Sequence, residues 1–212
     1  ERERIIADGT IKGCDFALEY GIAMNIAGGT HQAYSDHGEA FCMLNDQAIG
    51  ARYLLNKGLA KKILIVDLDV HQGNGTAEIF QNDDAVFTFS MHGEGNYPFK
   101  KEKSDLDIPL PKGTTDETYL SILKEKLPKL IESVQPDFIF YLCGVDILES
   151  DKLGTLGMTI EGCKKRDEYV LKTCYNLKIP VQCSMGGGYS PDIKIIVEAH
   201  ANTFRIAQNL YF

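Results

Sequence analysis

Short apolar segments alternate with longer, helix-like segments along the chain, and this alternation constrains the fold more than any other feature. The apolar segments predict strands over residues 22–26, 62–68, 85–90, 137–142 and 179–184. Helices are expected between them: one that ends at Gly21, one over 45–57 with Asn45 as N-cap, one that starts at "TTDE", where Thr114 and Glu117 have capping-box spacing, and two over 160–177 and 191–209. This order predicts a three-layer α/β/α domain with a mostly parallel central sheet.

Length and composition favour one globular domain over residues 1–212. No linker-like stretch or repeat divides the chain, and 44% of its residues are hydrophobic. The six cysteines have irregular spacing and no CxxC pair, which predicts reduced thiols in a cytoplasmic protein. A net charge of -8 without a long basic run disfavours direct nucleic-acid binding. No apolar run reaches the length of a membrane span, and no secretory signal is apparent, so no membrane association is expected.

Each predicted strand is followed by a glycine-containing segment with polar side chains. These segments read "AGGTHQA", "DVHQGNG", "MHGEGNYP", "CGVDILESD" and "MGGGYS". In a parallel sheet, ligands bind beyond the carboxyl ends of the strands, and glycine lets the backbone approach a ligand closely. Five such segments at one edge of the sheet predict an active site there.

A metal site is one interpretation of the segment that follows the strand at 62–68. Asp67, Asp69 and His71 occupy every second position, so their side chains point to the same side of an extended chain. Asp69 and His71, with Asp146 from another strand end, form a ligand set that suits a divalent ion such as zinc, and Asp67 could orient a histidine. The alternative is a cluster of strand-end side chains satisfied by helix N-termini, and the spacing alone leaves both open.

Four motifs resemble the histone deacetylase family, which has the arginase/deacetylase fold. They are "IAGGTHQAYSDHGEAFCMLND", "VDLDVHQGNGT", "YLCGVDILESDKLG" and "GGGY", and they follow one another in the family's order. "HQGNG" and "GVDILESDKLGTLGMT" are most similar to the class IV branch and its bacterial relatives. The resemblance runs from about position 5 to the end of the chain. It implies one deacetylase-like catalytic domain over 1–212 that lacks the N-terminal portion of the family domain.

The resemblance assigns roles to individual residues. It implies one zinc ion per chain, held by Asp69, His71 and Asp146, and a hydrogen bond from Tyr189 to the oxyanion that forms on the substrate carbonyl. His31 matches the first of the family's two tandem histidines, with Asp67 as its partner. Substrate-binding positions are Phe41, Tyr97, Leu153 and Gly187, although plain core packing remains an alternative for the first three. A structural potassium ion would be held by Asp67, Ser90 and the carbonyls of Asp69, His71 and Met91, and a second, outer potassium site would lie near Phe80, Val86 and Tyr119.

The sequence departs from the family pattern beside His31. Gln32 replaces the second histidine, which is the usual general base, and an amide cannot exchange a proton near neutral pH. Asn74 stands where many relatives have an aspartate that partners this histidine, and Ala40 replaces a common glycine at the tunnel rim. Gln32 therefore predicts slow catalysis.

Three functions remain open from the sequence. The leading one is a zinc-dependent amidohydrolase that removes acetyl or longer acyl groups from lysine side chains of a protein, slowed by Gln32. The second is a catalytically weakened module that binds acyl-lysine. The third is a deacetylase of small acylated amines such as acetylpolyamines. An arginase-like hydrolase with two manganese ions is disfavoured, because the extra ligands that a metal pair needs are absent. The oligomeric state is left open.

Overall fold

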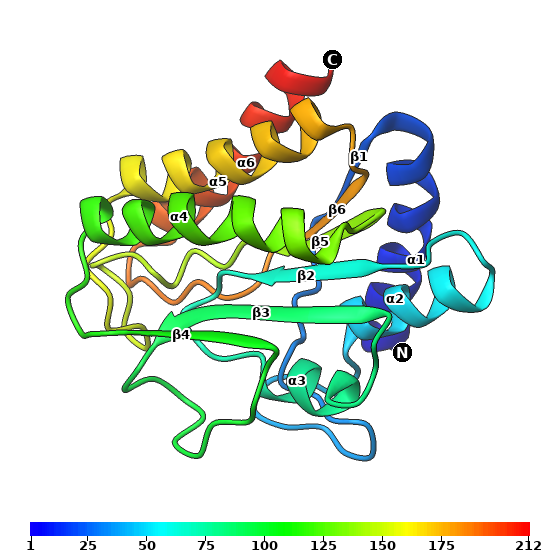
Figure 1. Ribbon diagram of the computed structural model, residues 1–212. Helices are drawn as coiled ribbons and strands as arrows, with labels where there is room; N and C mark the ends of the chain where they lie inside the picture. Colours follow the sequence, from blue (N-terminus) through cyan, green and yellow to red (C-terminus); the bar gives the residue numbers. More distant parts are fainter.

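The computed structural model describes all 212 residues. They form one parallel sheet with helices on both faces (Figure 1). Its elements are α1 (Arg2–Tyr20), β1 (Ile22–Asn25), α2 (Asp46–Asn56), β2 (Ile63–Asp67), α3 (Asn74–Phe80), β3 (Val86–Gly93), β4 (Leu106–Leu110), α4 (Asp116–Val134), β5 (Phe138–Leu142), α5 (Ile160–Leu177), β6 (Val181–Ser184) and α6 (Ile193–Tyr211). The predicted alternation of strands and helices is confirmed.

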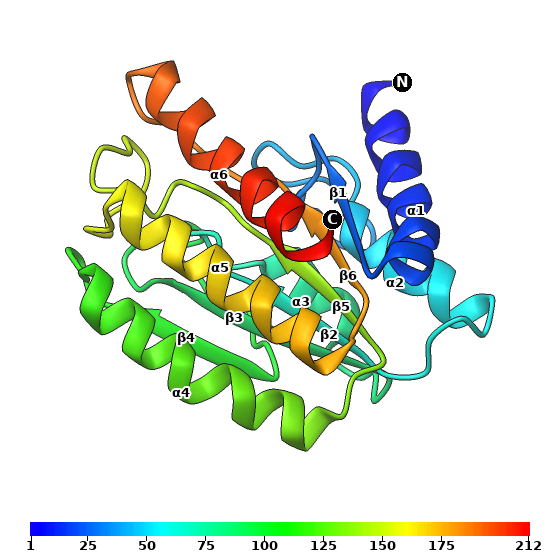
Figure 2. The same cartoon turned by 90° about the horizontal axis from the view of Figure 1, so that it is seen from above.

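The sheet has six strands in the order β1-β6-β5-β2-β3-β4, and every neighbouring pair is parallel. Helices α4, α5 and α6 run side by side across one face, as Figure 2 shows, while α1, α2 and α3 cover the other. Because β2 and β5 lie in the middle, every residue of both strands is buried. The three-layer α/β/α architecture is therefore confirmed, and the ends of β2 and β5 lie side by side.

The core divides between the two faces of the sheet along the side-chain alternation of β2. Leu64 and Val66 pack with the larger cluster under α4, α5 and α6. Ile63 and Ile65 point the other way, into a smaller cluster with α1 and α2. A strand covered on both faces reads as a continuous apolar run, which explains the run before Asp67.

Two elements were not predicted from the sequence. Helix α3 has only seven residues, too few for a helical period to stand out. Strand β4 contains Pro109 and lies at the edge of the sheet, where a missing N–H is tolerated. The capping box at Thr114 and Glu117 is wrong: the N-cap is Thr115, and the hydroxyl of Thr114 donates to the carbonyl of Pro111 at 2.6 Å instead.

Other local predictions are confirmed. The side chain of Asn45 accepts a hydrogen bond from the backbone N–H of Ala48 at 3.1 Å and so caps α2. Gly21 ends α1 in the left-handed conformation, with φ 85°. All six cysteines are free and buried. The helices are all too short or too polar for a transmembrane segment. A cytoplasmic location stays a prediction.

Candidate active site

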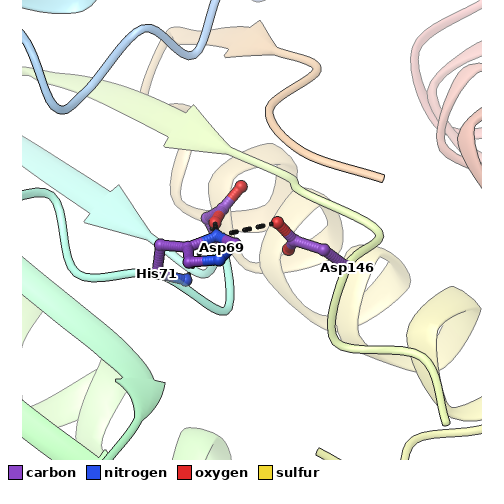
Figure 3. A group of neighbouring side chains, drawn as sticks. All are labelled: Asp69, His71 and Asp146. Carbon is purple, nitrogen blue, oxygen red and sulfur yellow. Dashed lines mark hydrogen bonds and ion pairs between the residues drawn. The ribbon is translucent and has the colours of Figure 1, made fainter. Parts of the chain in front are cut away.

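Asp69, His71 and Asp146 meet at the carboxyl ends of the two central strands. Asp69 and His71 follow β2, and Asp146 follows β5, whose residue Leu142 is in register with Asp67. One ligand atom from each of the three side chains lies within 4.8 Å of the others, and Figure 3 shows the side chains turned toward one another. The Nδ1 atom of His71 is 3.0 Å from Oδ1 of Asp69 and 3.1 Å from Oδ2 of Asp146.

Backbone N–H groups hold the two carboxylates in place. Asp69 accepts hydrogen bonds from His71 N at 2.9 Å and from Gly187 N at 2.8 Å, and Asp146 accepts one from Val70 N at 3.0 Å. A Cβ atom on Gly187 would lie 2.0 Å from Oδ2 of Asp146, so only glycine allows this close approach of the backbone. The site is thus built from three strand tails, those of β2, β5 and β6.

The charges of the cluster fit a bound cation. Burial raises the pKa of Asp146 to about 7, and the nearby charge of Asp69 adds to this effect. Burial acts against protonation of His71, but hydrogen bonds to Asp146 and Asp69 outweigh it and raise the pKa of the imidazole to about 10. The raised pKa lets His71 carry a proton that offsets the two buried carboxylates. A divalent ion could take over that task with the same three donors, which are a suitable set for zinc.

His31 and Asp67 form a buried pair beside this cluster. Nδ1 of His31 lies 2.7 Å from Oδ2 of Asp67, and its Nε2 lies 3.9 Å from Oδ1 of Asp69. Burial opposes protonation of His31, but the charges of Asp67 and Asp69 outweigh it and raise its pKa to about 9. The contact with Asp67 leaves Nε2 of His31 facing the cluster.

Gln32 follows His31 directly in the chain and Asn74 is the first residue of α3, and the two side chains have different environments. Gln32 is buried and contributes to the cavity described below. The amide nitrogen of Asn74 donates to the hydroxyl of Tyr34 at 3.1 Å and to Glu39 at 3.4 Å, whereas its Oδ1 is buried without a hydrogen-bond partner. Asn74 is therefore held by the loop around Tyr34 and Glu39, on its nitrogen side only.

A cavity of about 500 Å³ opens onto the cluster. Of the residues that line it, His31, Gln32 and Asp69 are buried, His71, Tyr97, Gly187 and Tyr189 are half-buried, and Phe41, Phe99 and Leu153 are exposed. Phe41 is 74% exposed and Leu153 46%, so plain core packing is wrong for both. Phe99, at 88% exposure, was not singled out from the sequence, although it follows one of the glycine-containing strand tails. The cavity thus leads from an apolar mouth to a polar end.

Tyr189 lies between the mouth and the cluster. Its ring packs edge-on against His71, with 6.3 Å between ring centroids, and is tilted against Phe41 at 6.0 Å. Its backbone N–H donates to Asp151 at 2.6 Å, which fixes the glycine-rich tail of β6. Burial raises the pKa of the Tyr189 phenol above its usual range, so the hydroxyl stays protonated and can donate a hydrogen bond.

The potassium-site residues named from the family pattern lie in different parts of the structure. Ser90 is in register with Asp67, and its hydroxyl lies 2.9 Å from Nδ1 of His92. Phe80 and Val86 belong to the core cluster on one face of the sheet, whereas Tyr119 belongs to the cluster on the other face. These last three residues therefore do not gather around an outer potassium site.

Ala40 adopts a backbone conformation that favours glycine. Its φ is 49°, in the left-handed region, and it contributes to the cavity wall next to Phe41. The methyl group that replaces the family's common glycine is therefore tolerated with backbone strain at the rim.

Comparisons with known proteins agree on one family. A family model described as the histone deacetylase domain matches residues 1–204. An uncharacterised protein from Picosynechococcus sp. is 49% identical, over 100% of this chain and 70% of that protein. Histone deacetylase 2 of Arabidopsis thaliana is 32% identical over 93% of this chain, and histone deacetylase 1 of Homo sapiens is 34% identical over 80%. The crystal structure of the HDA15 HD domain has the same fold, with a TM-score of 0.82 and 24% identity, over 97% of this chain and 63% of that one.

This chain spans only part of these relatives. The aligned region is 52% of the Arabidopsis deacetylase and 36% of the human one. The comparisons show the family but single out no branch of it, so the likeness to the class IV branch stays a prediction.

Proposed function

The chain belongs to the histone deacetylase family, and on that premise we propose that it is a zinc-dependent amidohydrolase that removes acetyl or longer acyl groups from lysine side chains. One observation carries the proposal: Asp69, His71 and Asp146 bring their ligand atoms within 4.8 Å of one another, and two of them, Asp69 and His71, line a cavity. Two carboxylates and an imidazole would hold one zinc ion per chain and leave coordination positions for substrate and water. When bound, the ion would polarise the amide carbonyl and acidify a water molecule.

The protein's own side chains would supply the proton transfers. His31 is oriented by Asp67, and its Nε2 faces the cluster, so it is the imidazole that can accept a proton from water and return it to the departing lysine amine. The charge of Asp67 and, to a smaller extent, that of Asp69 raise the pKa of His31; a cation beside Asp69 would offset the second of these charges and so favour the neutral form that a base requires. The Tyr189 hydroxyl would donate to the oxyanion.

The walls of the cavity favour an acyl-lysine as the substrate. Phe41, Tyr97, Phe99 and Leu153 offer apolar surface to the aliphatic part of a lysine side chain. Asp69 is the only acidic residue among the lining residues, which also include Arg2, so the lining itself offers little attraction to the second ammonium group of an acetylpolyamine. Lysine in a protein is therefore preferred here over a small acylated amine.

Gln32 supports a second candidate, a weakened module that binds acyl-lysine with little turnover. Gln32 is buried in the cavity at the position where the family resemblance expects the general base. Metal, cavity and Tyr189 would all remain, and only proton transfer would suffer.

We further propose that a potassium ion binds behind the zinc site, at Asp67 and Ser90. These residues are register partners, Asp67 at the end of β2 and Ser90 within β3. Carbonyl and carboxylate oxygens are suitable ligands for a hard cation.

The test combines metal analysis with turnover. We expect about one zinc ion per chain and release of acetate from an acetyl-lysine peptide, with slower release from an acetylpolyamine. Zinc binding without acetate release would favour the binding module. A faster reaction with the acetylpolyamine would refute the preference for lysine, and a protein that binds no zinc would refute the proposal.

A further inference from the structure

Arg166, on α5, is buried directly behind the candidate metal site. It is the largest of the fully buried side chains, although arginine is rarely buried without partners. Its charge is paired with the next residue, since Nε donates to Oδ1 of Asp167 at 2.8 Å and Nη2 lies 2.7 Å from the same oxygen. The family comparisons give this pair no role.

The remaining donors of Arg166 reach the tails of β2 and β5. Nη1 donates to the carbonyl of Leu68 at 3.1 Å and to that of Gly144 at 2.7 Å, and Nη2 donates to Cys143 at 3.3 Å. None of these three buried carbonyls accepts a hydrogen bond from a backbone N–H. Leu68 directly precedes Asp69, and Gly144 lies two residues before Asp146. The guanidinium thus joins the two segments that carry the candidate ligands.

The sheet itself does not hold these segments together. The ladder between β2 and β5 ends with a hydrogen bond from Leu68 N to Leu142 O at 3.1 Å. Beyond that point the two tails meet through polar contacts at the ligands themselves, from Val70 N to Asp146 and from His71 to both carboxylates. Arg166 adds a link between the tails that does not involve the ligand side chains.

The carboxylate of Asp167 is in turn fixed by two other elements. It accepts hydrogen bonds from the hydroxyl of Tyr141 on β5 at 2.5 Å and from that of Thr203 on α6 at 2.7 Å. Arg166 therefore has little freedom to move, and its planar fork can hold several carbonyls at set positions.

We propose that Arg166 is a positioning residue for the metal centre, which cross-links the tails of β2 and β5 and so sets the separation of Asp69 and Asp146. This inference rests on the proposed metal site. A purely structural ion pair would support the fold without a specific effect on metal affinity. A positioning residue, in contrast, changes metal affinity beyond its effect on stability.

The test compares Arg166→Lys with Leu171→Ala. Lysine keeps the charge but loses the fork, whereas Leu171 is a buried residue of the same helix that packs in the core. Zinc affinity is measured by competition with a chelator, the visible spectrum of the Co²⁺-substituted protein reports the coordination geometry, and thermal unfolding reports stability. We expect Arg166→Lys to weaken zinc binding about tenfold or more and to change the Co²⁺ spectrum. Leu171→Ala should lower the melting temperature and leave both metal readouts at the parental values.

Parental zinc affinity in a folded Arg166→Lys variant would overturn the inference alone. If both variants lose zinc affinity in proportion to the drop in their melting temperatures, the inference is also overturned, because the role of Arg166 would then be structural. A parent protein that binds no zinc would overturn the proposed function as well. If Arg166→Lys does not fold, Tyr141→Phe decides: it removes one donor to Asp167 and leaves Arg166 in place. A smaller loss of zinc affinity supports the inference, and an unchanged affinity overturns it.

Discussion

The substitution Gln32→His tests whether this protein has lost its general base. Gln32 is buried and lines the same cavity as His31, Asp69 and His71, so an imidazole at this position would be shielded from bulk solvent. At present His31 has to serve both as the partner of Asp67 and as the base. A second histidine would divide these tasks, as the family pattern does.

The size of the effect follows from what a base contributes. Proton transfer by a positioned side chain is typically worth about 10²–10⁴-fold in rate. The new imidazole would have no carboxylate to orient it, since Asn74 is an amide whose nitrogen is held by Tyr34 and Glu39. We therefore expect the low end of that range, about a hundredfold in kcat, which corresponds to about 2.7 kcal/mol of transition-state stabilisation.

The assay is the steady-state hydrolysis of an acetyl-lysine peptide by both proteins at equal zinc content. A base acts on the transition state, so kcat should rise while KM changes little. Gln32→Asn is the matched control, because it keeps an amide and cannot exchange a proton near neutral pH. An unchanged kcat for Gln32→His would refute the reasoning and show that His31 suffices. An equal rise for Gln32→Asn would show that the side chain at position 32 acts through shape.

Three further predictions concern the metal, the oxyanion and the fold. Asp146→Ala removes one of two anionic ligands and should abolish tight zinc binding, measured by chelator competition. The circular dichroism spectrum should stay close to that of the parent. Full zinc occupancy of the variant would contradict the ligand assignment. Tyr189→Phe should lower kcat about 10²–10³-fold with little change in KM, and a parental kcat would exclude Tyr189 as the oxyanion donor. Burial and the charge of Arg166 lower the pKa of His200 to about 4. In the unfolded chain this imidazole has a pKa near 6.5 and so takes up a proton that the folded protein does not. The free energy of unfolding should therefore fall by about 2 kcal/mol between pH 7 and pH 5 on account of this group. His200→Gln should remove that part of the pH dependence in denaturant titrations, and an unchanged pH dependence would speak against it.

The fold could be predicted where local sequence and burial agree. The run before Asp67 is apolar because β2 is covered on both faces, and Asn45 and Gly21 have capping chemistry that operates within a few residues. Strand β4 was not predicted because an edge strand with Pro109 lacks the apolar pattern of a buried strand. The choice of Thr114 as a cap failed because the hydroxyl found a nearer acceptor, the carbonyl of Pro111.

The candidate site could be predicted only in part for a similar reason. Asp69 and His71 are two residues apart, so their common direction follows from strand geometry. Asp146 is 75 positions from His71, and its approach depends on the pairing of β2 with β5, which no local pattern encodes. Arg166 gave no signal at all, because a charged residue within a helix normally indicates a solvated face. Its role is visible only in the three carbonyls that it contacts.

Gln32 and Asn74 form a pair of departures whose effects should not be additive. The Oδ1 atom of Asn74 is buried without a hydrogen-bond partner, so residue 74 already has a free acceptor atom that a carboxylate would replace. Adding Asn74→Asp to Gln32→His should therefore raise kcat further, by up to about tenfold, because a charged acceptor strengthens the base and fixes its orientation. Asn74→Asp alone should not help, since it buries a carboxylate beside Glu39 with no imidazole at position 32 to pair with. Kinetics of the two single variants and the double variant measure this coupling. If the gains of the single variants simply multiply in the double variant, the two positions act independently, and the idea that residue 74 orients the base at residue 32 is wrong.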